Sequence, residues 1–171
     1  MAKKSPASRM MPEETAVQTK LPSAITFRRH PVHPMLVHFP VAFLNGAVVT
    51  DSVFLWSEET FWAHMSFWLI AAGATMGVLA AIAGTAEFLL VPAIRLHTAA
   101  WGHFLAGITL LAFATANLML RIDDPLSTVE PWGIFLSVTT LAILALAASL
   151  GGKLVYHYLI GTGVGEAEQS V

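Results

Sequence analysis

Histidines and prolines alternate in one short stretch at the start of a long apolar run, His30-Pro31-Val32-His33-Pro34-Met35-Leu36-Val37-His38-Phe39-Pro40. Imidazole changes its charge near neutral pH and binds metals through either ring nitrogen. A histidine cluster beside a segment of membrane-spanning length is therefore a candidate functional site. Pro34 is expected in the first turn of a helix, and Pro40 inside that helix, where its ring removes a backbone hydrogen bond and bends the axis.

The chain has seven histidines. The apolar runs predict four antiparallel membrane spans, and most of the histidines then lie at the same end of the bundle. His64 alone falls near the opposite end. Histidines are common at membrane interfaces, so the positions of His30, His64 and His97 also have this simpler explanation. The six histidines expected at the end that carries both termini are His30, His33, His38, His97, His103 and His157.

His38 and His103 form the most informative pair. His38 lies four residues after Pro34 and His103 six residues after His97, which places each about 6–9 Å inside its span at 1.5 Å per residue. Their two spans run in the same direction and lie diagonally in an up-down-up-down bundle, so the imidazoles are predicted to face each other. Two opposed imidazoles between helices can hold a b-type haem. We therefore predict haem b with His38 and His103 as metal ligands.

Several other residues are expected around this cofactor. His33, His97 and His157 lie near the membrane surface, where they are predicted to hydrogen-bond haem propionates or a quinone. Asn45 lies two turns after His38, and it either orients a ligand or makes a hydrogen bond between helices.

Glu87 is the one carboxylate well inside the second apolar run. A charge there must be paired or protonated, so we expect a buried or half-buried side chain near the histidines, with Arg95, His157 or a ligating histidine as its partner. The preceding small residues either pack helices closely or clear space for the haem. These residues are Gly73, Gly77, Ala80 and Gly84.

Composition indicates an integral membrane protein, because 56% of the residues are hydrophobic, 12% are charged and the mean hydropathy is +0.67. The absence of cysteine excludes disulfides, thiolate metal sites, iron–sulfur clusters and covalent c-type haem. No nucleophile motif, phosphate-binding loop or nucleic-acid patch is recognisable. An electron-transfer subunit is therefore favoured over an independent enzyme, and the expected partners are the lipid bilayer and other protein subunits.

The predicted fold is all-α, a transmembrane four-helix bundle. Short linkers make neighbouring helices antiparallel, which favours up-down-up-down topology. Residues 1–29 are expected to be a disordered or docking basic tail, 30–160 the four-helix domain, and 161–171 a flexible tail. The four spans are predicted at about 34–56, 62–91, 97–120 and 132–159.

Charge predicts the orientation. Basic residues concentrate in the tail and at Arg95 and Lys153, whereas the opposite side has Arg121 as its one basic residue. Both termini are therefore expected in the cytoplasm, in a bacterial inner membrane. The acidic residues of the opposite side are Asp51, Glu58, Glu59, Asp123, Asp124 and Glu130.

A set of motifs extends over most of the chain after the tail. It comprises His33-Pro34-Met35-Leu36-Val37-His38-Phe39-Pro40, the stretch 84–87, His103 eighteen residues before Arg121, Gly151-Gly152-Lys153-Leu154-Val155-Tyr156 and Gly161-Thr162-Gly163-Val164. This set resembles the bacterial membrane family called domain of unknown function 2231. Members occur fused to Rieske or c-type cytochrome domains, which implies a redox setting.

His33, His38 and His103 match histidine positions in the motifs of this family. The family's ending usually reads Gly-Gly-x-Leu-Val-Tyr-x-His-Gly-x-Gly-Val, but here the terminal histidine is shifted to His157 and two residues are added before the glycines.

Three functions remain open from the sequence. The first is a b-type cytochrome that carries electrons between a quinone pool and a redox partner, as a subunit of a membrane redox complex or as a homo-oligomer. The second is a cofactor-free anchor or accessory subunit of a larger membrane complex. The third, a transporter or metal-handling protein, is disfavoured because the four helices show no inverted repeat.

Overall fold

The computed structural model describes residues 21–162. The predicted tail 1–29 and the predicted C-terminal tail 161–171 lie mostly outside these residues. The described chain is a bundle of four helices, each long and apolar enough to cross a membrane. This confirms the predicted all-α four-helix fold. The helices are α1 Val32–Ser57, α2 Thr60–Leu90, α3 Thr98–Leu120 and α4 Ile134–Tyr156.

Long apolar runs form helices here because a helix satisfies every backbone group within one segment, which a membrane interior requires. α1 begins at Val32, so Pro34 lies in its first turn, and Pro40 is buried inside it. Glu58 ends α1 in the left-handed conformation, with its backbone N–H bonded to the carbonyl of Phe54. α2 then begins at Thr60, and this tight turn makes the two helices antiparallel.

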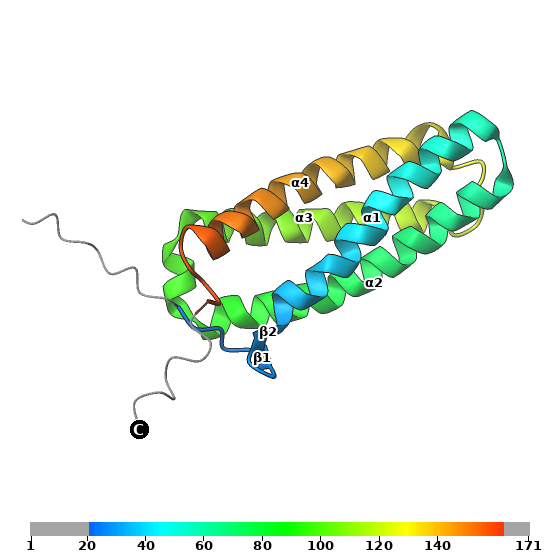
Figure 1. Ribbon diagram of the computed structural model, residues 1–171. Coiled ribbons are helices and arrows are strands. Elements are labelled where there is room, and N and C mark those ends of the chain that lie inside the picture. Colours follow the sequence, from blue (N-terminus) through cyan, green and yellow to red (C-terminus); the bar gives the residue numbers. More distant parts are fainter. Residues whose placement is uncertain (1–20, 163–171) are drawn as a thin grey trace, which may run out of the picture.

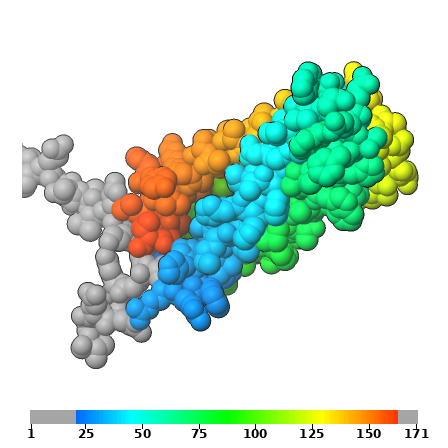
Figure 2. Space-filling view, turned by 45° about the vertical axis from the view of Figure 1, so that its right-hand side comes forward, coloured from blue at the N-terminus to red at the C-terminus, as the bar shows by residue number. Residues whose placement is uncertain are grey.

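The bundle consists of two helical hairpins, α1–α2 and α3–α4, with more extensive packing within each hairpin than between them. α1 also contacts α4, and α2 contacts α3, so α1 and α3 lie on one diagonal and run in the same direction (Figure 1). Figure 2 shows an elongated molecule with the α1–α2 hairpin toward the viewer. We call these the first and second hairpins.

The two ends of the bundle differ. At one end, the termini end, a 3₁₀ helix, η1 (Pro92–Leu96), joins α2 to α3. Here β1 (Thr26–Phe27) pairs with β2 (His30–Pro31), and the backbone N–H of Gly161 bonds to the carbonyl of Leu21 at 2.8 Å. At the other end, the loop end, residues 121–128 and a π-helical turn, η2 (Val129–Gly133), lead into α4.

Small residues fill the bundle interior while large apolar side chains point outward. Ala47 and Ala63 are buried, whereas Trp68 is 67% and Ile82 is 62% exposed. This distribution suits helices that pack closely against one another and present bulky side chains to lipid tails. One core cluster lies midway along the bundle and comprises Leu44, Ala74, Leu110, Ala114 and Leu144.

Candidate functional site

Two histidines face each other across the termini end of the bundle, and they are His33 on α1 and His103 on α3. Their ring centroids are 5.8 Å apart with an 80° angle between the ring planes. The expected geometry, with His38 opposite His103, is not observed because His38 is exposed. Five residues along a helix rotate the side chain by about 140°, so only one of His33 and His38 can face inward. α1 begins at Val32 and therefore includes His33, whereas the predicted span began at about residue 34 and left His33 outside it.

Each ring of this histidine pair is held by a backbone carbonyl of its own hairpin. Nδ1 of His33 lies 2.8 Å from the carbonyl oxygen of Ala80 on α2, and Nδ1 of His103 lies 2.9 Å from that of Ala147 on α4. A carbonyl only accepts hydrogen bonds, so a neutral ring carries its proton on Nδ1 and leaves a lone pair on Nε2. Within residues 21–162, neither Nε2 has a hydrogen bond.

A glycine lies one turn beyond each acceptor carbonyl and makes room for the ring. A Cβ on Gly84 would lie 2.8 Å from ring atoms of His33, and one on Gly151 would lie 3.1 Å from His103. These glycines therefore permit close approach of the imidazole to the neighbouring helix.

The second hairpin repeats the first around these contacts. Each histidine starts a His-x8-Ala-Phe pattern, at 33–43 and 103–113, and each acceptor carbonyl lies in a Leu-Ala-Ala-x-x-Gly pattern, at 79–84 and 146–151. This internal repeat is visible in the sequence and would have selected His33, which has a counterpart at 103. The motifs considered in the sequence did not include this repeat.

Glu87 is half-buried and holds the segment that precedes α1. Its carboxylate accepts hydrogen bonds from the Ser23 hydroxyl (2.8 Å) and from the backbone N–H groups of Ala24 (3.0 Å) and Ile25 (3.2 Å). Its observed partners are therefore in residues 23–25, rather than the predicted Arg95 or a histidine. Because Glu87 follows Gly84 by three residues on α2, this segment is fastened beside the histidine pair.

The remaining predicted site residues lie elsewhere. His97 stacks on Tyr158, with ring centroids 4.2 Å apart, and His157 is exposed beside the same tyrosine at 4.8 Å. Asn45 is exposed, and its side-chain amide donates to the carbonyl of Val41 in its own helix at 2.7 Å. Asn45 therefore makes no bond between helices, in contrast to one of its two predicted roles.

An apolar groove of about 380 Å³ lies between α2 and α3. Its lining includes neither histidine and neither Ala80 nor Gly84, and Val78, Ile82 and Leu89 are exposed, so the groove opens on the outer face of the bundle rather than at the histidine pair. Space is also open at Gly107, one turn after His103, where an added Cβ would meet nothing within 4 Å. The groove is lined by Val78, Ala81, Ile82, Thr85, Ala86, Leu89 and Leu111.

A second polar cluster near the loop end was not predicted. Arg121 and Asp51 form a bidentate ion pair of 2.6 and 2.8 Å, and both side chains are 0% exposed. The sequence analysis counted both as interfacial charges. Each follows a histidine of the pair by eighteen residues, which is the signal that could have connected them.

Three neighbours complete this charge cluster, which comprises Asp51, Arg121, Ser66, Asn117 and Ser137. Arg121 donates to Asn117 Oδ1 at 2.9 Å and to Ser66 Oγ at 3.0 Å, while the hydroxyl of Ser137 donates to Asp51 at 2.6 Å. The guanidinium lies against Gly133, where a Cβ would come within 2.7 Å of it. The charge of Asp51 and the charge and N–H donors of Arg121 are therefore satisfied by protein groups.

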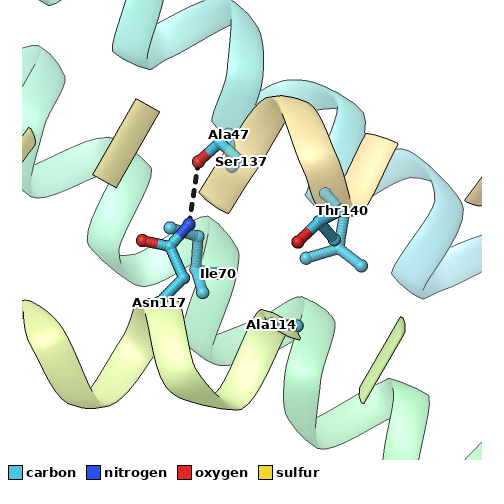
Figure 3. Close-up of a pocket in the computed structure, with 7 residues that line it drawn as sticks. Ala47, Ile70, Ala114, Asn117, Ser137 and Thr140 are labelled. Carbon is cyan, nitrogen blue, oxygen red and sulfur yellow. Dashed lines mark hydrogen bonds between the residues drawn. The ribbon is translucent and has the colours of Figure 1, made fainter. Parts of the chain in front are cut away.

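A small gap lies beside the charge cluster (Figure 3). Asn117 donates to Ser137 at 2.9 Å on one side of it, and the buried hydroxyl of Thr140 has no partner in the described part of the chain. The gap is too narrow to hold a water molecule. It is therefore a packing gap, lined by Leu44, Ala47, Ile70, Ala114, Asn117, Ser137 and Thr140.

Comparison with protein families gives one match. A family model described as "Predicted membrane protein (DUF2231)" matches residues 29–164. The chain belongs to this family. The match confirms the resemblance found in the sequence and agrees with the four apolar helices. No curated protein and no solved structure matches the chain.

Proposed function

We propose that this protein is a membrane electron-transfer subunit that holds a b-type haem between His33 and His103. The observation that carries the proposal is the pair of imidazoles on diagonal helices, each fixed through Nδ1 and each without a hydrogen bond to Nε2 within residues 21–162. The proposal keeps the cofactor that the sequence predicts and replaces His38 by His33 in the ligand pair.

The spacing of the rings suits one metal between them. Two imidazoles that bind one metal at about 2 Å have ring centroids roughly 6 Å apart, close to the observed 5.8 Å. Within residues 21–162, no group of three or more His, Cys, Asp or Glu residues could hold a metal ion. Two imidazoles are few ligands for a bare cation, whereas the iron of a bound haem would have four nitrogens of its macrocycle and would need only two ligands from His33 and His103.

The surroundings also suit an apolar macrocycle. The residues that contact the two rings from the neighbouring helices are small and apolar, and they include Ala80, Gly84, Ala147 and Gly151. Open space at Gly107 adjoins His103 on the same helix.

The chain's own residues have distinct roles in this proposal. When bound, haem supplies a one-electron couple at its iron. The carbonyls of Ala80 and Ala147 keep each proton on Nδ1 and leave each Nε2 lone pair available to iron, as carbonyls that bond the other ring nitrogen do at histidine–metal sites. His97 and His157, at the termini end, remain candidates for hydrogen bonds to propionates or to a quinone. No role is assigned to the exposed Asn45.

The proposed setting is a bacterial inner membrane with both termini in the cytoplasm. Described basic residues at the termini end are Arg28, Arg29, Arg95 and Lys153, whereas Arg121 is neutralised by its buried partner. The loop end therefore has no exposed basic residue among the described residues, which strengthens the positive-inside argument. A quinone and a second redox protein are the proposed electron-transfer partners.

An absorption spectrum of the detergent-purified full chain, oxidised and then reduced with dithionite, tests the proposal. We expect the spectrum of a six-coordinate low-spin haem, lost in His33→Ala and in His103→Ala. His38→Ala is the matched control, because it removes an exposed imidazole five residues away on the same helix. A protein that purifies without haem from haem-replete cells, or that keeps its spectrum in both ligand variants, would instead favour the anchor-subunit function.

A further inference from the structure

The two hairpins share one set of contacts on their inner faces. Each presents a histidine bonded to a carbonyl of its own hairpin and packed on a glycine, and these contacts belong to the same repeated patterns. At other equivalent core positions the side chains differ in size, as at Leu44 and Ala114 and at Gly77 and Leu144. Size and charge can therefore both distinguish a pairing of the first hairpin with the second from a pairing of two copies of the same hairpin.

Charge breaks this equivalence at one position. Asp51 and Arg121 occupy the same place in the repeat, eighteen residues after His33 and His103, but their charges are opposite. They meet in the interior as a bidentate pair, with both side chains fully buried. Two first hairpins would bring two aspartates together there, and two second hairpins would bring two arginines together.

We propose that Asp51 and Arg121 select the partner of each hairpin, so that the first hairpin packs only against a second hairpin. A buried ion pair contributes little net stability compared with neutral side chains of similar size, whereas a like-charged or unpaired buried group is strongly disfavoured. The pair therefore acts chiefly by excluding the wrong association, in which two chains combine through identical hairpins.

The surrounding groups agree with this assignment. Ser66 and Ser137 come from both hairpins and bond to the guanidinium or the carboxylate, and Asn117 bonds to the guanidinium. The donors of Arg121 are thus matched within the protein, and the adjacent gap is too narrow for a water molecule. These features describe a contact between two protein surfaces rather than a ligand site.

The test uses full-length chains with reversed charges and two different affinity tags. Asp51→Arg places arginine in both hairpins of one chain, and Arg121→Asp places aspartate in both hairpins of the other. When the two variants are co-expressed, each hairpin finds its opposite charge only in the other chain, provided that η1 extends. We expect a discrete two-chain complex in detergent, with at least tenfold more co-purification than from two differently tagged Asp51→Arg chains.

Co-purification no greater than in that matched control would overturn the proposal. If the reversed chains are degraded, a neutral double variant, Asp51→Asn with Arg121→Gln, decides it. This variant should keep its helical circular dichroism, while its differently tagged copies form mixed complexes that wild-type copies do not form. Neutral copies that stay as separate as wild-type copies would mean that the ion pair does not select the partner.

Discussion

The same two helices, α1 and α3, carry two polar layers that differ in burial and in hydrogen bonding. The histidine pair and the ion pair are separated by eighteen residues on each helix, which is about 27 Å at 1.5 Å per residue. Near the loop end, both side chains are fully buried and the donors of Arg121 have acceptors. Near the termini end, each imidazole is half-buried and uses one nitrogen of two within the described residues.

This difference separates a structural role from a ligand-binding role. A buried group whose bonds are all made by protein has nothing left to offer a ligand, so its contribution is to folding and pairing. A half-buried imidazole with one free nitrogen, held rigidly through the other, is pre-arranged for coordination. Substitutions at the ion pair should therefore affect stability, and substitutions at the histidine pair should affect ligand binding.

The largest expected effect is at the ion pair. Arg121→Met leaves the Asp51 carboxylate buried without its cation, so the free energy of unfolding should fall by about 3–5 kcal/mol. Denaturant-induced loss of helical circular dichroism in micelles measures this. Asn45→Ala is the control, because Asn45 is exposed and bonded within its own helix, and its effect should be within about 0.5 kcal/mol. Equal effects of the two substitutions would contradict the structural role.

The next effect is at the glycines behind the histidines. Gly84→Ala brings a methyl group within 2.8 Å of the His33 ring, so the ring must leave the Ala80 carbonyl. Haem affinity should fall by roughly tenfold, about the 1.4 kcal/mol expected for one hydrogen bond. Gly151→Ala, with a longer contact of 3.1 Å to His103, should have a smaller effect, and Gly152→Ala, whose Cβ would lie 4.0 Å from the nearest side chain, should have none. Haem titration of the three purified variants measures these affinities. A different ranking of the three affinities would mean that Gly84 and Gly151 do not position the rings.

A smaller effect is expected at the carboxylate that holds residues 23–25. Glu87→Ala removes the acceptor of the Ala24 and Ile25 N–H groups, so their hydrogen–deuterium exchange should accelerate by about tenfold, given partial solvent screening of these bonds. Glu130→Ala, an exposed carboxylate at the loop end, is the control. Unchanged exchange in Glu87→Ala would mean that other contacts hold this segment.

The smallest effect is at the surface of the loop end. Hydrogen bonds from the hydroxyl and backbone N–H of Ser127, and from the backbone N–H of Leu126, lower the pKa of Asp124. This carboxylate therefore stabilises the loop above about pH 4, its ordinary pKa, and the contribution disappears as pH falls through the lowered value. Ser127→Ala should raise the pKa of Asp124 toward the ordinary value in a carbon-13 NMR titration. No change would mean that the backbone N–H groups alone determine the shift.

Local sequence determined the number, length and antiparallel order of the helices. Apolar runs of spanning length must become helices in a membrane because no other open structure satisfies their backbone groups, and linkers as short as the one after Ser57 leave no other path. The identity of the first histidine of the pair was also available from the internal repeat, because His33 and His103 begin matching patterns. The predicted depth within the membrane favoured His38 instead, because the helix was expected to begin at Pro34.

Only the tertiary structure decided which polar groups meet. Residues five apart on a helix lie about 140° apart around its axis, and whether His33 or His38 faces inward depends on which side of α1 packs against the other helices. The pairing of Asp51 with Arg121 joins residues on diagonal helices that are seventy positions apart; the repeat places them at equivalent positions, but only the packed bundle brings them into contact. The partners of Glu87 are decided in the same way, because the path of residues 21–31 across the termini end depends on the assembled bundle rather than on the segment itself.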